Sequence, residues 1–484
     1  MLTSYAGALK AWMYWPILHA LGPRLSTLRE PMLLVGAASI WLFFLLLRRV
    51  AGDRAAIIGS SLLATDSIYL VTTCFDWGPV ALQHVLIIGG MLLVIKFHQE
   101  RPQAALAGAF FLFGLALWDK ALAVWMLSGL GVSAALLYSG EIRRALRAQR
   151  VAAAGLAFCI GALPLLVYNI GNSFRTFNEN VHRDTANLAA KAHMLEETIG
   201  GPGLFGWLTA EDSQTPAPHQ PRGPVQRASA AISKLAGHPR RSLALYGFLL
   251  ALALAPLAAP QERRAIMFAC IAMAVAWIQM ATTANAGGSV HHTILLWPLP
   301  EMVIAISFAA ASRRFGRAGR VIITAIVPIM LVSGGLVMNE YYTVMLRNGG
   351  AMAWNDGILE LSDYLRYIPA KQVLSLDWGI TDPLRFLNGG HLALAGADEQ
   401  LSKPELSVSD KAIIERMISE PSHVFIAHTS NHEFFPGSTP KLLQLAADSG
   451  YHRQKLTVIS DRYGRPVFEL FRFARLAVNS PAGN

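Results

Sequence analysis

The sequence predicts an α-helical, polytopic membrane protein of about ten spans, followed by a soluble C-terminal α/β domain. Hydrophobic residues make up 53% of the 484 residues and charged residues only 15%, which is more apolar surface than one water-soluble core needs. Apolar runs long enough to cross about 30 Å of hydrocarbon recur as far as residue 340. Beyond residue 341 the composition becomes that of a soluble domain. We therefore expect a membrane domain over 1–340 and a soluble domain over 341–484.

The apolar runs and the loops between them predict a topology. The ten predicted spans are 32–48, 55–73, 78–97, 103–117, 121–138, 151–170, 242–259, 265–283, 292–311 and 321–339. One set of loops is basic, with Arg48, Arg49, Arg54, Lys96, Arg101, Arg143, Arg144, Arg147, Arg150, Arg263, Arg264, Arg313, Arg314, Arg317 and Arg320. In the short loops that alternate with these, the only Lys or Arg residue is Lys120. Because Lys and Arg are retained in the cytoplasm, we expect the alternate loops, 1–30, 171–240 and the C-terminal domain to face outward.

The first thirty residues are not predicted to span the membrane. Residues 6–21 combine aromatic and apolar side chains with Lys10 and Pro16, which predicts an amphipathic helix in the outer interface. An outward N-terminus without a cleavable signal pattern predicts that a first span is missing from this chain. Either the start lies downstream of the true one, or the gene is truncated.

The later segments have their own local signals. Phe174 to Ile199 has a helical pattern that stops at a glycine- and proline-rich run, and the polar, proline-rich stretch from Ser213 to Pro224 predicts a loop. In the C-terminal domain we expect helices near 356–367, 409–419 and 440–449, strands at 372–376 and 423–428, and a hairpin over 455–473. This domain lacks the glycine-rich signals of a Rossmann nucleotide site.

Three polar clusters at predicted outer span ends are the candidate site. They are Phe75-Asp76-Trp77, Trp118-Asp119-Lys120 and His291-His292. Ionisable groups are costly in such positions unless they serve a site, so we expect the clusters to converge on one outward-facing cavity under 1–30 and 171–200. Simpler interpretations stay open for each of them. These are a helix cap for Asp76, a local ion pair for Asp119 and Lys120, interfacial positions for the two histidines and Trp77, and a solvated helix face for Glu179.

Several of these segments occur in an order typical of a known family. The order is Tyr5-Ala6-Gly7-Ala8-Leu9-Lys10, Leu25-Ser26-Thr27-Leu28-Arg29-Glu30-Pro31, Gly52-Asp53-Arg54-Ala55-Ala56, Asp76, and then His291-His292-Thr293. It resembles the bacterial polytopic membrane glycosyltransferases of the C superfold, which include protein mannosyltransferases (glycosyltransferase family 39) and the aminoarabinose transferase. The resemblance implies transfer of a sugar from a polyprenyl-phosphate donor to an acceptor on the outer face of the cytoplasmic membrane.

The chemistry of that reaction assigns expected roles to the candidate residues. A carboxylate must take the proton of the acceptor hydroxyl, and cations must stabilise the departing phosphate. Asp76 is the expected carboxylate. Lys120, Lys10, His291 and His292 supply phosphate contacts, and Asp119, Tyr5, Trp77 and Glu179 are further candidates. The family's leading acidic residue lies upstream of the part that matches Tyr5 to Lys10.

Cofactors, partners and other functions follow from the same pattern. A divalent metal fits the chemistry, but the sequence shows no complete ligand set, so the cofactor stays unknown. Membrane lipids and the lipid-linked donor are the expected partners, the acceptor is unidentified, and the scattered arginines do not indicate nucleic acid. One alternative is a non-catalytic or truncated scaffold that presents the C-terminal domain. A transporter is less favoured, because the ionisable residues gather at one end and no internal repeat is visible.

Overall fold

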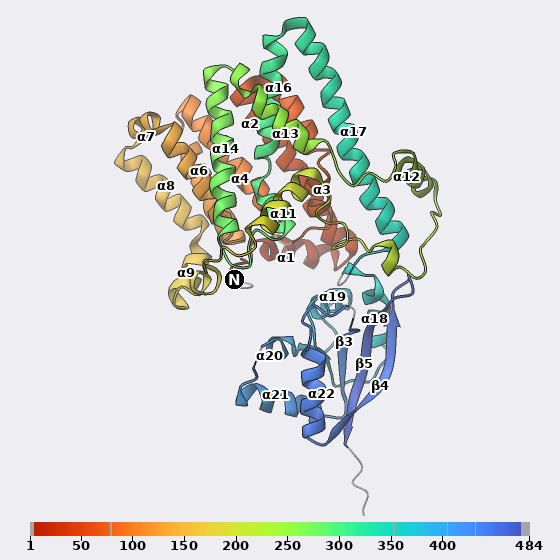
Figure 1. Ribbon diagram of the computed structural model, residues 1–484. Helices are drawn as coiled ribbons and strands as arrows, with labels where there is room; N and C mark the ends of the chain where they lie inside the picture. The colour runs from red at the N-terminus through yellow and green to blue at the C-terminus, as the bar shows by residue number, and fades with distance from the viewer. Residues whose placement is uncertain (1–3, 78–79, 352–353, 404, 431, 476–484) are drawn as a thin grey trace, which may run out of the picture. The chain divides into compact units, whose positions relative to one another are not determined.

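The protein has two compact units, which Figure 1 shows. The computed structural model describes residues 4–77, 80–351, 354–403, 405–430 and 432–475. Unit 1 comprises Met1–Leu204 and Ile232–Glu340, and unit 2 comprises Phe205–Ala231 and Tyr341–Asn484. Gly78 and Pro79, which begin the predicted third span, lie outside the described residues.

Unit 1 is helical throughout its described part, as predicted. Its helices are α1 (Leu9–Leu21), α2 (Leu25–Leu63), α3 (Ser67–Cys74), α4 (Val80–Glu100), α5 (Gln103–Asp119), α6 (Ala123–Leu137), α7 (Ser139–Ala145), α8 (Ala148–Gly161), α9 (Leu163–Gly171), α10 (Arg175–Asn180), α11 (Leu188–Gly200), α13 (Ala244–Leu254), α14 (Pro260–Ala281), α15 (Val290–Thr293) and α16 (Leu299–Arg314). Helices α12 (Pro224–Leu235) and α17 (Gly316–Asn348) begin in one unit and end in the other. The predicted fold class is confirmed.

Several of the predicted spans are broken or short in the structure. By length and composition, five helices in the described ranges are able to cross a membrane, or seven if each bent pair forms one span. The predicted spans 32–48 and 55–73 are one helix, α2, broken at Gly52, followed by the short α3. Gly52 adopts φ 84°, a conformation that glycine enters without steric cost. The predicted span 151–170 is α8 and α9, which are bent by 70° relative to each other, and Pro164 lies in the first turn of α9.

The basic turns of unit 1 lie at one end of it. Arg49 pairs with Glu100 at 2.6 Å, Arg264 pairs with Glu141 at 2.8 Å, and Arg313 pairs with Glu262. Exposed pairs of this kind contribute little stability, but they show that turns distant in sequence meet. In Figure 1 the α6–α7 and α16–α17 turns are at one end of the unit, and α1 is at the opposite end.

Helices α1, α10 and α11 belong to the other end. In α1, Tyr14 is buried while Trp12 and Trp15 are exposed, as an interfacial helix requires. The single helix predicted over 174–199 is divided into α10 and α11, because residues Phe174 and Asn187 adopt left-handed backbone conformations before each of them. Helix α11 ends at Gly200, where the glycine-rich run predicts its end.

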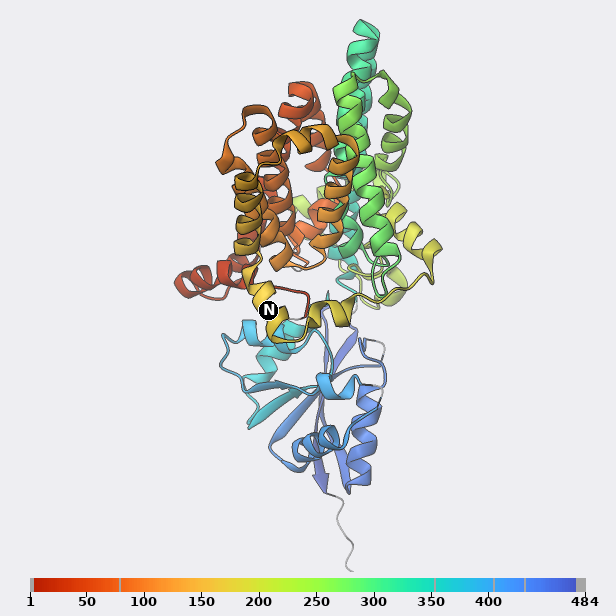
Figure 2. The same ribbon diagram turned by 90° about the vertical axis from the view of Figure 1, so that its left-hand side faces the viewer.

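Unit 2 is an open five-stranded sheet with helices on both faces (Figure 2). The strand order is β2 (Leu394–Gly396), β1 (Gln372–Ser375), β3 (His423–His428), β5 (Pro466–Arg475), β4 (Tyr451–Ser460). Strands β2, β1 and β3 are parallel, and the β4–β5 hairpin adds to β3 in the antiparallel direction. The helices are α18 (Gly357–Leu365), α19 (Thr381–Leu387), α20 (Asp398–Leu401), α21 (Val408–Ser419) and α22 (Ser438–Asp448).

Apolar side chains alternate between the two faces along the strands, so this sheet has a hydrophobic core on each face. Leu374 and Phe425 face α20, α21 and α22, whereas Val373 and Val424 face α18 and α19. Five of these helices and strands agree with the prediction to within a few residues, as does the β4–β5 hairpin, but α19, β2 and α20 were not predicted. These three elements have only seven, three and four residues, too few for a periodic pattern to emerge.

A buried carboxylate joins the carboxyl ends of β1 and β3. Asp377 accepts hydrogen bonds from His428 Nδ1 at 2.8 Å and from the backbone N–H groups of Trp378, Phe434 and Phe435 at 2.7–3.0 Å. Burial opposes ionisation of Asp377, but the hydrogen bonds from His428 and the backbone outweigh it and hold its pKa below the usual value. Asp377 thus fixes the loop after β3 to the end of β1.

Replacing Asp377 with Asn is expected to loosen this loop. A hydrogen bond to a charged group contributes about 1.5–3 kcal/mol, so amide exchange of Phe434 and Phe435 should accelerate by roughly tenfold or more. Since the folded pKa is depressed, the stabilisation is present at neutral pH and is lost as the pH falls through that value. Hydrogen exchange measured at pH 7 on the full chain checks this. Equal protection in both proteins would contradict it.

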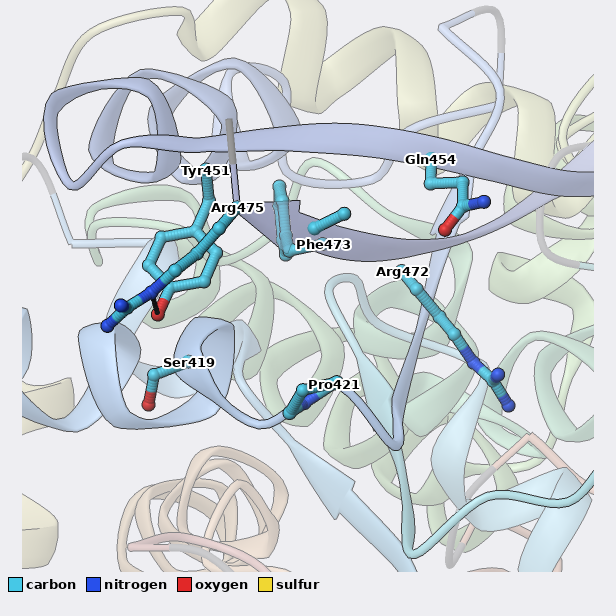
Figure 3. A pocket seen from close by; sticks show the side chains of 8 residues that line it. Ser419, Pro421, Tyr451, Gln454, Arg472, Phe473 and Arg475 are labelled. Carbon is cyan, nitrogen blue, oxygen red and sulfur yellow. Dashed lines mark hydrogen bonds between the residues drawn. The ribbon is translucent and has the colours of Figure 1, made fainter. Parts of the chain in front are cut away.

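Unit 2 also has an open pocket at the opposite end of its parallel strands (Figure 3). Its volume is about 410 Å³, and it is lined by Ser419, Pro421, Tyr451, Gln454, Arg472, Phe473, Ala474 and Arg475. The Arg475 guanidinium donates a hydrogen bond to the Tyr451 hydroxyl at 3.1 Å across its rim. None of the candidate site residues from the sequence lines this pocket.

Candidate active site

Asp76 lies in the turn between α3 and α4 and faces α1. Its Oδ2 atom forms an ion pair with Lys10, while its Oδ1 atom is buried without a hydrogen-bond partner among the described residues. The Asp76 backbone adopts φ 55°, a left-handed conformation that is uncommon outside glycine and is often found at functional sites. Burial raises the pKa of Asp76, and the Lys10 ammonium opposes that rise.

Asp119 and Lys120 form the second cluster, at the end of α5. The Asp119 side chain is 1% exposed, and in the described structure neither of its carboxylate oxygens has a hydrogen-bond partner. A local pair with Lys120 therefore does not satisfy this carboxylate. The charges that act most strongly on Asp119 are those of Lys10, Lys120 and Asp76, so the first two clusters share one electrostatic environment.

The segment before α1 brings Lys10 to these carboxylates. Its backbone pairs with the Asp119–Lys120 turn through Gly7 N to Asp119 O at 3.0 Å and Ala121 N to Tyr5 O at 2.8 Å. A Cβ atom on Gly7 would lie 1.9 Å from the Trp118 carbonyl oxygen, so only glycine permits this approach.

The two histidines occupy α15 and join the same region. The His291 ring lies 4.8 Å from the Trp77 ring and 4.0 Å from the His292 ring, measured between centroids. Ser289 Oγ is 2.8 Å from His291 Nδ1, whereas His292 Nδ1 is buried without a partner in the described ranges. Lys120 is among the charges that act on both imidazoles, which connects the third cluster to the second.

The structure thus gathers most of the residues that the sequence indicates. Asp76, Lys10, Asp119, Lys120, His291, His292 and Trp77 lie together, with the backbone of Tyr5 beside them. Glu179 does not join them, since its side chain is 43% exposed and pairs with Arg175 at 2.5 Å on α10. For Glu179 the structure favours the solvated helix face.

Two further cations lie at the site that the sequence did not predict. Arg29 on α2 donates a hydrogen bond to the Phe75 carbonyl oxygen, and its charge acts on Asp76. Lys191 on α11 is buried, donates to Ala281 O at 2.8 Å and Thr283 O at 3.0 Å, and acts on His292. Arg29 belongs to the run Leu25–Pro31 that carries the family resemblance, so a signal existed for it. Lys191 lies in a helix of mixed charge, where nothing distinguishes it.

The described residues do not form a set of metal ligands. Within the described ranges, no group of three or more His, Cys, Asp or Glu side chains is arranged to hold a metal ion. The site's own charged groups are two carboxylates flanked by lysines and an arginine. Such a site is able to accept a proton and to stabilise an anion.

Comparisons with known proteins identify a matching family profile and structures of the same fold. Residues 7–168 match the sequence profile of the dolichyl-phosphate-mannose-protein mannosyltransferase family. No curated protein sequence matches the chain significantly. The structure of ArnT from Cupriavidus metallidurans bound to undecaprenyl phosphate superposes with a TM-score of 0.57 and 12% identity, covering 96% of this chain and 88% of that one.

This chain has the fold of the C-superfold membrane glycosyltransferases. The apo form of the same ArnT gives a TM-score of 0.55 at 12% identity over 95% of this chain and 86% of that one. The apo oligosaccharyltransferase of Archaeoglobus fulgidus gives 0.52 at 11% identity over 99% of this chain and 67% of that one. The resemblance inferred from the residues is therefore confirmed. The protein is a multi-pass membrane protein, and the family match over residues 7–168 supports glycosyl transfer.

Proposed function

We propose that this protein transfers a sugar from a polyprenyl-phosphate-linked donor to an acceptor on the outer face of the cytoplasmic membrane. The observation that carries the proposal is the pair of buried carboxylates, Asp76 and Asp119, beside Lys10 and Lys120. Among the described residues, Asp76 Oδ1 and both Asp119 oxygens have no hydrogen-bond partner. Leaving such oxygens unpaired costs free energy, which a ligand with matching donors would repay.

The proposed reaction uses these residues in distinct roles. The acceptor hydroxyl attacks the anomeric carbon, the bond from that carbon to the phosphate oxygen breaks, and the lipid phosphate departs. Asp76 takes the proton of the hydroxyl, while Lys10 and Lys120 stabilise the charge on the phosphate. When donor phosphate binds, it competes with Asp76 for Lys10, which frees the carboxylate to act as a base.

The orientation of the protein is part of the proposal. The basic turns gather at the end of unit 1 opposite α1, and basic turns are retained in the cytoplasm. The site, the loop 171–240 and the domain over 341–484 then face outward. Labelling of an introduced cysteine at Glu179 in intact cells tests the orientation, with Arg144→Cys as the cytoplasmic control. Labelling at residue 144 and not at residue 179 would show that the protein has the opposite orientation.

The lipid product should bind the site without any acceptor. A ligand present at one hundred times its dissociation constant stabilises the folded state by about 2.7 kcal/mol, so undecaprenyl phosphate is expected to raise the apparent unfolding temperature of the purified full chain. Undecaprenol, which lacks the phosphate, is the matched control and should produce a much smaller rise. Equal rises with both lipids would show that the polyprenyl chain alone is recognised and would remove the phosphate site.

Catalysis itself is tested by incubating the purified chain with polyprenyl-phosphate-linked sugars and membrane extract as the source of acceptor. Release of polyprenyl phosphate together with incorporation of labelled sugar is the expected result. A protein that binds the donor but transfers nothing with any of the sugars tried would support the scaffold alternative.

A further inference from the structure

Unit 2 has a row of aromatic side chains at the carboxyl ends of its parallel strands. The row consists of Trp207, Trp354, Trp378 and Phe434, whose successive ring centroids are 5.1, 6.2 and 4.8 Å apart. All four belong to unit 2, and none of them has a role in the proposed transfer reaction. We call this set the aromatic row.

The position of the row coincides with the point where the strand order of the sheet reverses. The chain leaves β1 through α19 to reach β2 on one side, and then returns through α20 and α21 to β3 on the other side of β1. Helix α19 packs on one face of the sheet, and α20 and α21 pack on the other. In open α/β sheets, ligands bind outside the carboxyl ends of the strands at such a point. Here Asp377 follows β1, and His428 ends β3.

Hydrogen bonds to Asp377 fix the backbone that carries the two exposed rings of the row. Trp378 is 42% exposed and Phe434 is 43% exposed, and their planes are 35° apart. The backbone N–H groups of both residues donate to the Asp377 carboxylate, at 2.8 and 2.7 Å. Because the backbone of the two residues is already fixed, a ligand that stacks on the rings does not have to order the loop.

Polar groups around the row determine which ligand fits. Asp398 follows β2 and lies close enough to Asp377 for the two charges to interact, so it offers hydrogen-bond acceptors at the same edge. Of the arginines near this edge, Arg465 is paired with Asp461 at 2.5 Å and Arg385 with Asp382 at 3.1 Å. Flat aromatic faces beside a carboxylate, with neighbouring cations already neutralised, suit an uncharged ligand that has apolar faces and many hydroxyl groups.

We propose that the aromatic row binds a neutral saccharide, with sugar rings stacked on Trp378 and Phe434 and hydroxyl groups donating to Asp398. This site is separate from the transfer site in unit 1, and it neither requires nor implies catalysis there. It assigns unit 2 a binding function of its own.

The test is calorimetric titration of the full chain, in phosphatidylcholine nanodiscs, with maltohexaose, chitohexaose and mannohexaose. At least one of the three should bind, and Trp378→Ala and Phe434→Ala should weaken that binding by roughly tenfold or more, since each removes a stacked ring. Trp378→Phe keeps a flat ring and should retain intermediate affinity. Tyr367→Ala is the matched control, because Tyr367 is an aromatic residue of unit 2 that is 86% exposed and lies outside the row.

Three results would overturn the proposal. They are no heat of binding with any of the three saccharides, an equal loss of affinity in Tyr367→Ala, and brominated-lipid quenching that is smaller in Trp378→Phe than in the wild type without any saccharide binding. The last result would assign the row to the membrane interface. Because binding is measured without turnover, its failure leaves the transfer proposal intact, and a failure of transfer leaves the saccharide site intact.

Discussion

Asp76→Asn is expected to lower the kcat of sugar transfer by about 10²–10⁴-fold, the contribution typical of a positioned general base. Asparagine has nearly the same shape and keeps one oxygen acceptor, but it is unable to take a proton from the acceptor hydroxyl. Initial rates of sugar incorporation, measured with saturating donor, give the comparison. Donor binding should survive in the variant, because the lysines remain.

The pH dependence of the wild-type rate gives a second measure of Asp76. Burial raises the pKa of this carboxyl, and only the ionised form accepts a proton, so the rate should fall as the pH decreases through that raised value. Lys10 opposes the rise, so Lys10→Ala should move this fall to higher pH. Glu179→Gln is the matched control, since Glu179 is an exposed acid outside the cluster. Undiminished activity in Asp76→Asn would exclude Asp76 as the base.

Lys120→Met is expected to lower kcat by about 10²–10³-fold, the usual loss when one group that stabilises a developing anion is removed. Methionine fills a similar volume but carries no charge to place against the departing phosphate. Lys120 is also the cation whose charge reaches both histidines and Asp119, so its loss should weaken undecaprenyl phosphate binding. The variant needs rates at several donor concentrations, which separate kcat from KM.

Lys234→Ala serves as the control for this experiment, because Lys234 is an exposed lysine of α12 outside the cluster. Its rates should equal those of the wild type. If Lys120→Met changed only the unfolding temperature and left kcat and donor affinity as they were, Lys120 would be a structural residue of the turn and not a phosphate ligand.

Local sequence patterns predicted most of the helices and strands of unit 2, but not which of the strands pair. Strand β3 begins at His423 and ends at His428, as the apolar run between polar residues indicates. The contact of Asp377 with His428 could not be predicted, because these residues are 51 positions apart and their approach depends on parallel pairing of β1 with β3. Nothing local in the sequence specifies which strands become neighbours.

Composition, charge and the local helix and strand patterns determined that this chain is a helical membrane protein with a small α/β domain, and they identified Asp76, Asp119, Lys120 and the two histidines as unusual. Such conclusions are available from sequence because hydrophobic burial and the cost of a charge in lipid act on each segment separately. The tertiary structure alone decided that Lys10 faces Asp76, that Arg29 and Lys191 join the cluster, and that Glu179 stays outside it. Those contacts depend on how α1, α2 and α11 pack, and packing is a property of the whole fold.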